Sequence, residues 1–394
     1  MNNKIKILFI SHSSAMVGAE RSLLLLLKNI DRDCFDPIVV LPTSGPLKRE
    51  IEYLNIKTYE VKSPWWVSGG GRNVIRAILR LGYNIIQEVV ALIRLYKIIK
   101  REKIDVIYTN TIVNFSGAII SCITQKPHIW HIREILPGNP DLHFFLPYRI
   151  LFKFISRFSN VVVTNSCATA DQFQSIIPNE KIRVIYNAVD LDEFKNIPSL
   201  PDINGVKTTD YVVAVIGSLQ KRKAQDDAIK AIKIAKETIP NIKLLIVGEG
   251  NKKFKDYLKH LAFKLDVSDN VIFTGYRDDV PAILHHCNLL LVPSWNEPFG
   301  RVVIEAMAAG IPVIGADSGG VKEIIEDGFN GYLVPPKDPI KIAEKIIYLF
   351  HHPKLAKKMG NEGRKIVKEK FSIQNYVKNI EKVIYDVVMY KKRN

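Results

Sequence analysis

Short apolar segments alternate with helical patterns along almost the whole chain of 394 residues, and this alternation constrains the fold more than any other feature. The first half contains five such runs of strand length: KIKILFISH, PIVVLP, IDVIYTNT, PHIWHI and NVVVTNS. Each is followed by helical or loop sequence. Strands that alternate with helices predict an α/β fold with a parallel sheet covered on both faces.

A break in this pattern divides the chain. Residues 195–210, KNIPSLPDINGVKTTD, are rich in Pro, Asn and Asp and have no periodicity, which indicates a linker or loop. A second alternating series then begins with YVVAVIGS, KLLIVGEG, NVIFTGY, LLLVPS, IPVIGADSGG and GYLVPP, and helices follow from about Pro339. We therefore expect two doubly wound, Rossmann-like sheets with a cleft between them, faced by the carboxyl ends of the strands.

Composition excludes several other classes of protein. Hydrophobic residues make up 47% and charged residues 24%, which excludes a disordered or collagen-like chain. The four cysteines lie far apart, without a CxxC pair, which excludes a zinc ribbon and makes a reducing compartment the best fit. The chain shows neither a secretory signal nor an apolar stretch that reads as a membrane span, so we expect a soluble or peripheral protein.

The net charge of +16 is concentrated in two segments. Residues 72–103 carry eight Lys and Arg against two acids, and residues 352–394 carry twelve against four, whereas residues 201–351 carry nineteen of each. Basic segments of this kind attract phosphates, nucleic acid or an anionic membrane. A nucleic-acid binder is not expected, because the neutral second half holds the richest motifs and no nucleic-acid module is present.

The segment from Pro293 to Ile325 holds two glutamates, Glu297 and Glu305, eight residues apart. Glu297 lies in a predicted loop and Glu305 in the helix that follows. The start of a helix beside a Gly-containing loop presents free N–H groups to an anion, and the two carboxylates can accept hydrogen bonds from sugar hydroxyls. The alternative is that Glu297 caps the helix and Glu305 is a solvated surface residue.

The run EPFGRVVIEAMAAGIPVI resembles the E-x7-E signature of retaining nucleotide-sugar glycosyltransferases with the GT-B fold, the family 4-like or group 1 enzymes. That resemblance implies that Glu297 contacts the hydroxyls of the donor sugar. It implies that the backbone at Phe299 and Gly300 meets the sugar or the diphosphate. Glu305 would hold the ribose.

The resemblance extends upstream to VVAVIGSLQKRKAQDDAI. Gly217 matches the family's turn after the first strand of the second domain, and Lys223 matches the lysine that binds the donor diphosphate. The chain departs from the family pattern at Ser218, usually Arg, and at Ala224, usually Gly. Arg222 is therefore expected to supply the missing cation, because guanidinium and ammonium groups at a helix start pair with phosphate.

The first half offers weaker candidates. The loop SHSSAMVGAERS resembles the family's Gly-Gly-Ala-Glu loop near the donor phosphate and acceptor, although only Gly18 of the two glycines is present. In IWHIREI, pattern alone favours a core role for His131, whereas the resemblance places it near the sugar. Asn187 and Asp190 match a turn that we interpret as structural. The sequence Asp-Leu-Asp at Asp190 is not expected to bind metal.

The resemblance implies a retaining transfer from a nucleotide sugar to an acceptor hydroxyl by same-face substitution, without a metal or other cofactor. The expected domains are an acceptor-binding domain over residues 1–195, a nucleotide-sugar-binding domain over 196–370, and a helix over 371–394 that crosses back. The expected acceptor is a carbohydrate or polyprenyl-linked glycan. Segments 72–103 and 352–394 would hold the enzyme on the inner face of the cell membrane, although the first can equally be a pair of surface helices broken at Gly82.

Alternatives on the same architecture are a phosphorylase, a nucleotide-sugar epimerase, and a non-catalytic nucleotide-sugar-binding partner. A phosphorylase would consume inorganic phosphate, and an epimerase would need no acceptor. A binding partner would take up nucleotide without turnover.

Overall fold

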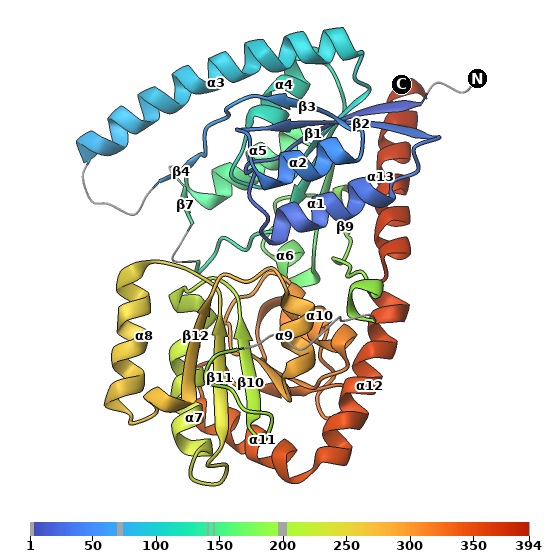
Figure 1. Cartoon of the computed structure of the whole chain (residues 1–394). Coiled ribbons are helices and arrows are strands. Elements are labelled where there is room, and N and C mark those ends of the chain that lie inside the picture. The colour runs from blue at the N-terminus through green and yellow to red at the C-terminus, as the bar shows by residue number, and fades with distance from the viewer. Residues whose placement is uncertain (1–3, 69–73, 140–141, 145, 196–202, 394) are drawn as a thin grey trace. The chain divides into compact units, whose positions relative to one another are not determined.

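The computed structural model describes residues 4–68, 74–139, 142–144, 146–195 and 203–393, without the side chains at 68, 74–78, 392 and 393. Two compact units divide the chain. The first unit comprises Met1–Asn187 and Ile373–Asn394, and the second comprises Ala188–Ser372 (Figure 1). The expected α/β fold with two Rossmann-like sheets is confirmed, with one sheet in each unit.

The first unit is built on a seven-stranded parallel sheet with the order β3-β2-β1-β5-β6-β8-β9. The strands are β1 (Ile5–Ile10), β2 (Phe35–Leu41), β3 (Lys57–Glu60), β5 (Val106–Thr109), β6 (His128–Ile132), β8 (Val161–Thr164) and β9 (Ile182–Val184). A separate two-stranded antiparallel pair joins β4 (Val67–Ser68) to β7 (His143–Phe144). The inner strands of the seven-stranded sheet are mostly apolar and buried, as is typical of a parallel sheet covered on both faces.

Among the described residues, the α-helices of the first unit come from the first half of the chain and from its C-terminal end. They are α1 (Gly18–Asn29), α2 (Pro46–Tyr53), α3 (Val74–Glu102), α4 (Ser116–Thr124), α5 (Tyr148–Phe158), α6 (Cys167–Asp171) and α13 (Ile373–Arg393). Ala91 and Leu95 of α3 pack in one core with Leu8 and Ile10 of β1. One side of α3 is thereby buried on the sheet.

The expected break of the basic segment at Gly82 is wrong, because α3 runs through it as one helix of 29 residues. Gly82 is exposed, and a Cβ there would meet nothing within 4 Å. Arg72 lies outside the described residues, and the side chain of Arg76 is not described. The side chains of Arg80, Arg94 and Lys97, three other basic residues of α3, are described.

The second unit is built on a six-stranded parallel sheet with the order β12-β11-β10-β13-β14-β15. Its strands are β10 (Tyr211–Ile216), β11 (Ile242–Val247), β12 (Val271–Gly275), β13 (Leu289–Val292), β14 (Val313–Ala316) and β15 (Tyr332–Val334). The strand order reverses between β10 and β13. In open α/β sheets ligands bind beyond the carboxyl ends of the strands at such a reversal.

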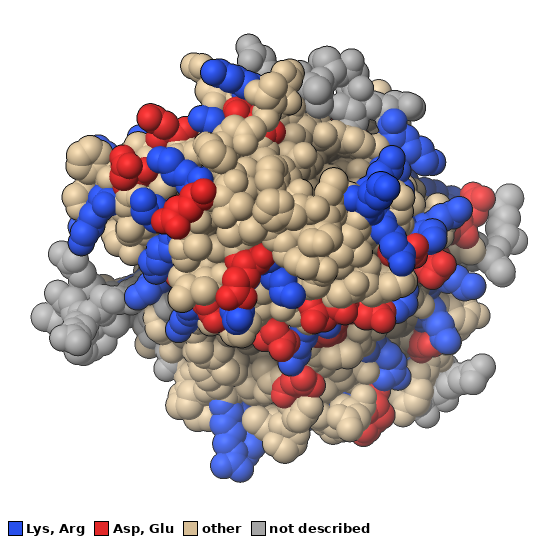
Figure 2. All heavy atoms as spheres, turned by 90° about the horizontal axis from the view of Figure 1, so that it is seen from below, with Lys and Arg blue, Asp and Glu red and all other residues tan. Residues whose placement is uncertain are grey.

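The helices of the second unit cover both faces of its sheet. They are α7 (Gln225–Ala235), α8 (Lys252–Lys264), α9 (Val280–His286), α10 (Arg301–Ala309), α11 (Pro339–His351) and α12 (Pro353–Lys370). The basic segment 352–394 therefore contributes α12 to the second unit and α13 to the first. Figure 2 shows basic and acidic side chains intermingled over most of the face that it draws, with a group of basic ones at its right side.

Within the described part of the chain, no helix is both long and apolar enough to cross a membrane.

Candidate active site

Two glycines shape the turn after β10 in the second unit. Gly217 has φ +149° and Gly248, which follows β11, has φ +137°. A Cβ at Gly248 would lie 2.1 Å from the carbonyl oxygen of Gly217, so the two strand ends meet at a distance that excludes a side chain. This turn leads into the 3-10 turn η3 (Lys221–Lys223) and then into α7. Gly217 thus directly follows β10, the strand at which the order of the sheet reverses.

Arg222 and Lys223 of η3 both contact Glu297, which lies in the loop after β13. The Lys223 Nζ lies 2.7 Å and the Arg222 Nη1 3.2 Å from Oε2 of Glu297. All three side chains are largely buried. Burial opposes ionisation of Glu297, but the adjacent Lys223 and Arg222 outweigh it and lower the pKa of the carboxyl. The cluster therefore holds two cations against one carboxylate and keeps a net positive charge for an anion.

The loop that carries Glu297 is fixed by close backbone contacts. The Gly320 N–H donates to the carbonyl of Glu297 at 2.8 Å, and the Trp295 N–H donates to the carbonyl of Arg222 at 3.1 Å. A Cβ at Gly319, where φ is +60°, would lie 2.2 Å from the Glu297 carbonyl oxygen. The small-residue turn 317–320 thus serves to bring β14 against this loop.

Helix α10 begins directly after this loop. Its N-cap is Gly300, with φ +88° and no side-chain cap, so no side chain of the cap occupies the first N–H groups of the helix. N–H groups and a helix dipole in this position can bind an anion, and the anion site expected from the sequence stays a prediction. Phe299 just before it is buried and packs edge-on against Phe371.

Glu305 is not a solvated residue on the surface of α10. It is 8% exposed, and its Oε1 accepts from Nε of Arg301 at 2.8 Å. The expectation that Glu305 holds a ribose requires an oxygen beyond this ion pair. That role stays a prediction.

His131 lies on β6 of the first unit and is fully buried. Its Nδ1 forms hydrogen bonds with the Tyr108 hydroxyl and with Arg133, while its Nε2 is buried without a partner among the described residues. Burial first, and then the charge of Arg133, hold its pKa well below the usual 6.5. His131 is therefore neutral with one ring nitrogen unused. In contrast, both ring nitrogens of His128 are bonded inside the core.

Arg133, which the sequence analysis did not single out, is the centre of a buried network in the first unit. Its guanidinium donates to the side-chain oxygens of Asn110 and Asn187 and to the Tyr376 hydroxyl. The fixed spacing of His131 and Arg133, two residues apart at the end of one strand, could have indicated that they share a face. Asn187 thus has a structural partner, in agreement with the interpretation given to it.

The loop after β1 places Gly18 at the start of α1, with open space around it. Two residues later Glu20 is fully buried, and its Oε1 lies 3.3 Å from Nδ1 of His12. Burial is the main cause that raises the pKa of Glu20 to about 7 and lowers that of His12 to about 4. The sequence analysis did not identify this pair of His12 and Glu20, in addition to Arg133.

Asp190 accepts from the backbone N–H of Asp192 at 2.9 Å, which is a local turn. Among the described residues no group of three or more His, Cys, Asp or Glu side chains is placed to hold a metal ion.

The structure brings Gly217, Arg222, Lys223, Glu297 and Gly300 into contact in the second unit, which also contains Phe299 and Glu305. Gly18 and His131 lie in the first unit.

Family models match both halves of the chain. "Glycosyltransferase Family 4" matches residues 16–193 and "Glycosyl transferases group 1" matches residues 196–366. The N-acetyl-alpha-D-glucosaminyl L-malate synthase of Bacillus anthracis is 32% identical over 64% of this chain and 65% of its own length. An uncharacterized glycosyltransferase of Methanocaldococcus jannaschii is 30% identical over 73% of this chain and 76% of its own length.

Two further likenesses cover nearly the whole chain. An Escherichia coli UDP-Gal:alpha-D-GlcNAc-diphosphoundecaprenol alpha-1,3-galactosyltransferase is 23% identical over 99% of both chains. The crystal structure of Anabaena Alr3699/HepE in complex with UDP and glucose has a TM-score of 0.80 and 25% identity, covering 97% of this chain and 99% of that one. The chain belongs to the group 1, family 4 glycosyltransferases with the GT-B fold.

Proposed function

We propose that this glycosyltransferase moves a sugar from a nucleotide-sugar donor to an acceptor hydroxyl in glycan synthesis, with retention of the anomeric configuration. The observation that carries the proposal is the cluster of Arg222, Lys223 and Glu297 at the carboxyl end of a parallel sheet, beside the uncapped start of α10. Two cations and a helix N-terminus suit a diphosphate, and a fixed carboxylate suits sugar hydroxyls.

In the proposed reaction, Arg222 and Lys223 stabilise the negative charge that develops on the leaving diphosphate. Both ion pairs end on Oε2 of Glu297, and its Oε1 has no partner among the described residues, so this oxygen can accept from the donor sugar. Glu297 is held by its cations and is a poor covalent nucleophile. We therefore infer same-face substitution, in which a leaving phosphate oxygen takes the proton of the acceptor hydroxyl, and no metal is required.

For His131 we keep the role that the resemblance implies, a contact to the donor sugar. Its unused Nε2 and its lowered pKa support a neutral hydrogen-bonding group rather than a cation. Glu305 is proposed to hold the ribose through the oxygen that Arg301 does not occupy.

The acceptor is proposed to be a lipid-linked or envelope glycan precursor. The E. coli relative is named for a diphosphoundecaprenol acceptor. The exposed side of α3 supports a peripheral place on the inner face of the membrane, because large apolar side chains such as Leu79, Ile86 and Ile93 lie there 54–69% exposed. Arg80, Arg94 and Lys97 lie on the same helix. Apolar and basic side chains on one helix are typical of interfacial binding.

The first experiment is slow donor hydrolysis followed by proton NMR over UDP-, GDP-, ADP- and dTDP-sugars, in the presence of EDTA. UDP-sugars come first, because HepE was crystallised with UDP and glucose. We expect one donor to be cleaved with the first-formed sugar keeping the anomeric configuration of the donor. An inverted product would overturn retention, and loss of turnover with EDTA would overturn metal independence.

The same experiment separates the alternatives. Conversion that depends on inorganic phosphate would identify a phosphorylase, and a changed sugar still attached to its nucleotide would identify an epimerase. Nucleotide binding without turnover, even with membrane extract as acceptor, would identify a non-catalytic partner.

A further inference from the structure

Helix α12 of the second unit carries a continuous basic face. Its cations recur at helical spacing, and they are Lys354, Lys357, Lys358, Arg364, Lys365 and Lys368. The opposite side of α12 is buried on α10, where a Cβ at Gly360 would lie 1.9 Å from the carbonyl oxygen of Gly310. The two glycines Gly360 and Gly363 thus fix α12 at close range and leave its basic face outward.

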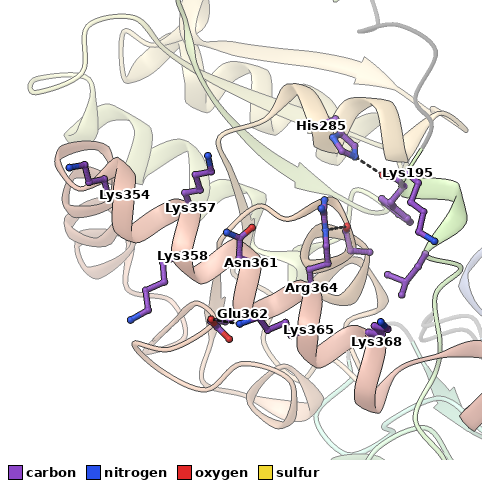
Figure 3. Close-up of a pocket in the computed structure, with 13 residues that line it drawn as sticks. Lys195, His285, Lys354, Lys357, Lys358, Asn361, Glu362, Arg364, Lys365 and Lys368 are labelled. Carbon is purple, nitrogen blue, oxygen red and sulfur yellow. Dashed lines mark hydrogen bonds and ion pairs between the residues drawn. The ribbon is translucent and has the colours of Figure 1, made fainter.

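This face lines a cavity of about 940 Å³ that is formed with η2 (Asp192–Phe194) and α9. Figure 3 shows Lys357, Asn361 and Arg364 pointing to the same side of α12 as His285, with Lys368 toward one end of the helix and Lys354 toward the other. The lining also includes the apolar residues Leu191 and Ala308. Glu362 is the one acid among the lining residues.

The cavity is separate from the candidate donor site. None of Arg222, Lys223, Glu297 and Glu305 lines it. It meets α10 at Ala308, near the C-terminal end of that helix, whereas Glu297 precedes the N-terminal end.

Some of these cations already have structural partners. Arg364 donates to the carbonyls of Ala308 and Ala309 at the end of α10, and Lys365 pairs with Glu362 at 2.9 Å. Lys195 at the edge of the cavity pairs with Asp192. In contrast, the exposed Lys354, Lys357, Lys358 and Lys368 have no partner among the described residues. Four unpaired lysines around one hollow repel each other and favour an anion.

The spacing of these lysines selects the class of anion. Lys354 and Lys368 are 14 positions apart, which is about 21 Å along a helix. A single phosphate cannot span this distance, whereas a chain with several phosphate groups can. The concave shape suits a chain better than a flat bilayer. Of the two aromatic rings in the lining, Phe194 is 4% exposed, which leaves the exposed His285 as a single ring, whereas single-stranded nucleic acid is bound by stacking successive bases on several rings.

We propose that α12, η2 and α9 form a groove that binds a linear, phosphate-bearing chain outside the donor site. Resting on the proposed function, this chain is the already polymerised, phosphodiester-containing part of an acceptor or product glycan. The groove would hold that chain while the reaction proceeds elsewhere on the enzyme. The contacts are electrostatic, since lysine ammonium groups meet phosphate oxygens.

The test measures binding of inorganic polyphosphate to the full-length protein by calorimetry over a range of salt concentrations. We expect the long polyphosphate to bind more tightly than tripolyphosphate, and tripolyphosphate more tightly than orthophosphate. The double variant Lys357→Glu, Lys368→Glu should bind the long chain at least tenfold more weakly, with the slope of log K against log salt reduced by about two. A matched control is Lys207→Glu, Lys264→Glu, which reverses two exposed lysines elsewhere in the second unit and should bind as the wild type does.

Equal binding by the wild type and the groove variant would overturn the proposal. So would groove-dependent binding to vesicles of anionic phospholipid without binding to polyphosphate, which would identify a membrane site, or tighter binding of single-stranded RNA than of polyphosphate. Donor hydrolysis is measured in parallel. If no donor is turned over, even with membrane extract as acceptor, while the groove variant still loses polyphosphate, the groove stands and the proposed function falls.

Discussion

At the scale of single residues, Glu297 is the most informative side chain of the second unit. Its Oε2 is shared by Lys223 and Arg222, which fixes the carboxylate and lowers its pKa despite burial. Breaking a buried ion pair by removing one partner leaves an uncompensated charge. Glu297 therefore links the stability of the loop to the chemistry proposed for it.

Replacing Glu297 by Gln should lower donor turnover roughly 100-fold, because the neutral amide orients the sugar poorly and removes the negative charge that Arg222 and Lys223 share. The variant should also melt at a lower temperature, and UDP should recover more of the melting temperature than in the wild type, since its diphosphate replaces the lost anion. Kinetics and thermal melts with and without UDP measure both effects. The control is Glu344→Gln, which breaks the exposed ion pair of Glu344 with Lys341 on α11. Full activity of the Glu297 variant would contradict the assignment of the donor site.

Glu20 makes a different prediction, about pH. Its pKa is raised from 4.5 to about 7, so the folded protein resists its ionisation, and stability falls as the pH rises through this interval. Glu20→Gln should remove this loss. Above pH 7 the free energy of unfolding of the variant, measured in urea, should exceed that of the wild type by up to about 3 kcal/mol. Below pH 4.5 the two proteins should differ little. Glu50→Gln, exposed on α2, should follow the wild type at every pH. If the stability of the Glu20 variant also follows that of the wild type at every pH, the raised pKa of Glu20 is refuted.

The residues that the sequence could indicate are those whose role depends on local spacing. Lys223 and Glu297 stand in segments with a strong family pattern, and the structure brings them together. Local spacing could place Arg133 on the same face as His131, but it could not predict its burial, because an arginine after a strand normally predicts a solvated cation. Its burial depends on Asn110, Asn187 and Tyr376, which come from three distant segments.

At the scale of elements, all six strands of the second sheet and the inner strands of the first were predictable, whereas β3 and β9 at the edges of the first sheet were not. Strands β1 and β10 are apolar, apart from the half-buried Lys6 near the start of β1, because both faces are covered. In contrast, β3 reads KTYE, and none of its residues is buried, since it lies at the edge of its sheet. The polar sequence of β3 therefore carries no signal of burial, and its pairing with β2 arises from tertiary structure.

Two helical glycines make an element-scale prediction. Gly82 in α3 has open space around it, so Gly82→Ala should stabilise the first unit by about 0.5–1 kcal/mol through reduced backbone entropy in the unfolded chain. Gly360 in α12 is in close contact with the backbone of Gly310, so Gly360→Ala should destabilise the second unit by about 1–3 kcal/mol. Urea unfolding of both variants measures these opposite signs. A loss of stability on Gly82→Ala would show that α3 is not a continuous helix there.

At the scale of the whole molecule, the chain is divided unequally between its units. The second unit is one continuous segment with a complete sheet and core, whereas the first takes its last helix from the C-terminus. The alternation of strands and helices is local, so the fold class could be predicted from it. The distribution of the C-terminal charge between α12 and α13 could not, because it depends on which unit each helix packs against.

This division predicts the effect of removing α13. Its apolar residues buried in the first unit are Tyr376, Val377, Ile380, Val383, Ile384, Val387 and Val388. At about 1.5 kcal/mol or more for each side chain, their loss is of the order of the whole stability of a domain. A chain that ends at Ser372 should therefore lose hydrogen-exchange protection in β1, β5 and β6 but keep it in β10, β11 and β13. It should still bind UDP.

The control is a chain that ends at Val388, which keeps every buried apolar residue of α13 named above and should keep protection in both sheets. Exchange measured by mass spectrometry in the presence and absence of UDP assigns the effect to each unit. Nucleotide should slow exchange in segments 217–225 and 295–303 of both chains, because the proposed phosphate-binding groups all belong to the second unit. Loss of protection in both sheets of the chain ending at Ser372 would mean that the second unit cannot fold alone, although its core is formed by residues of that unit.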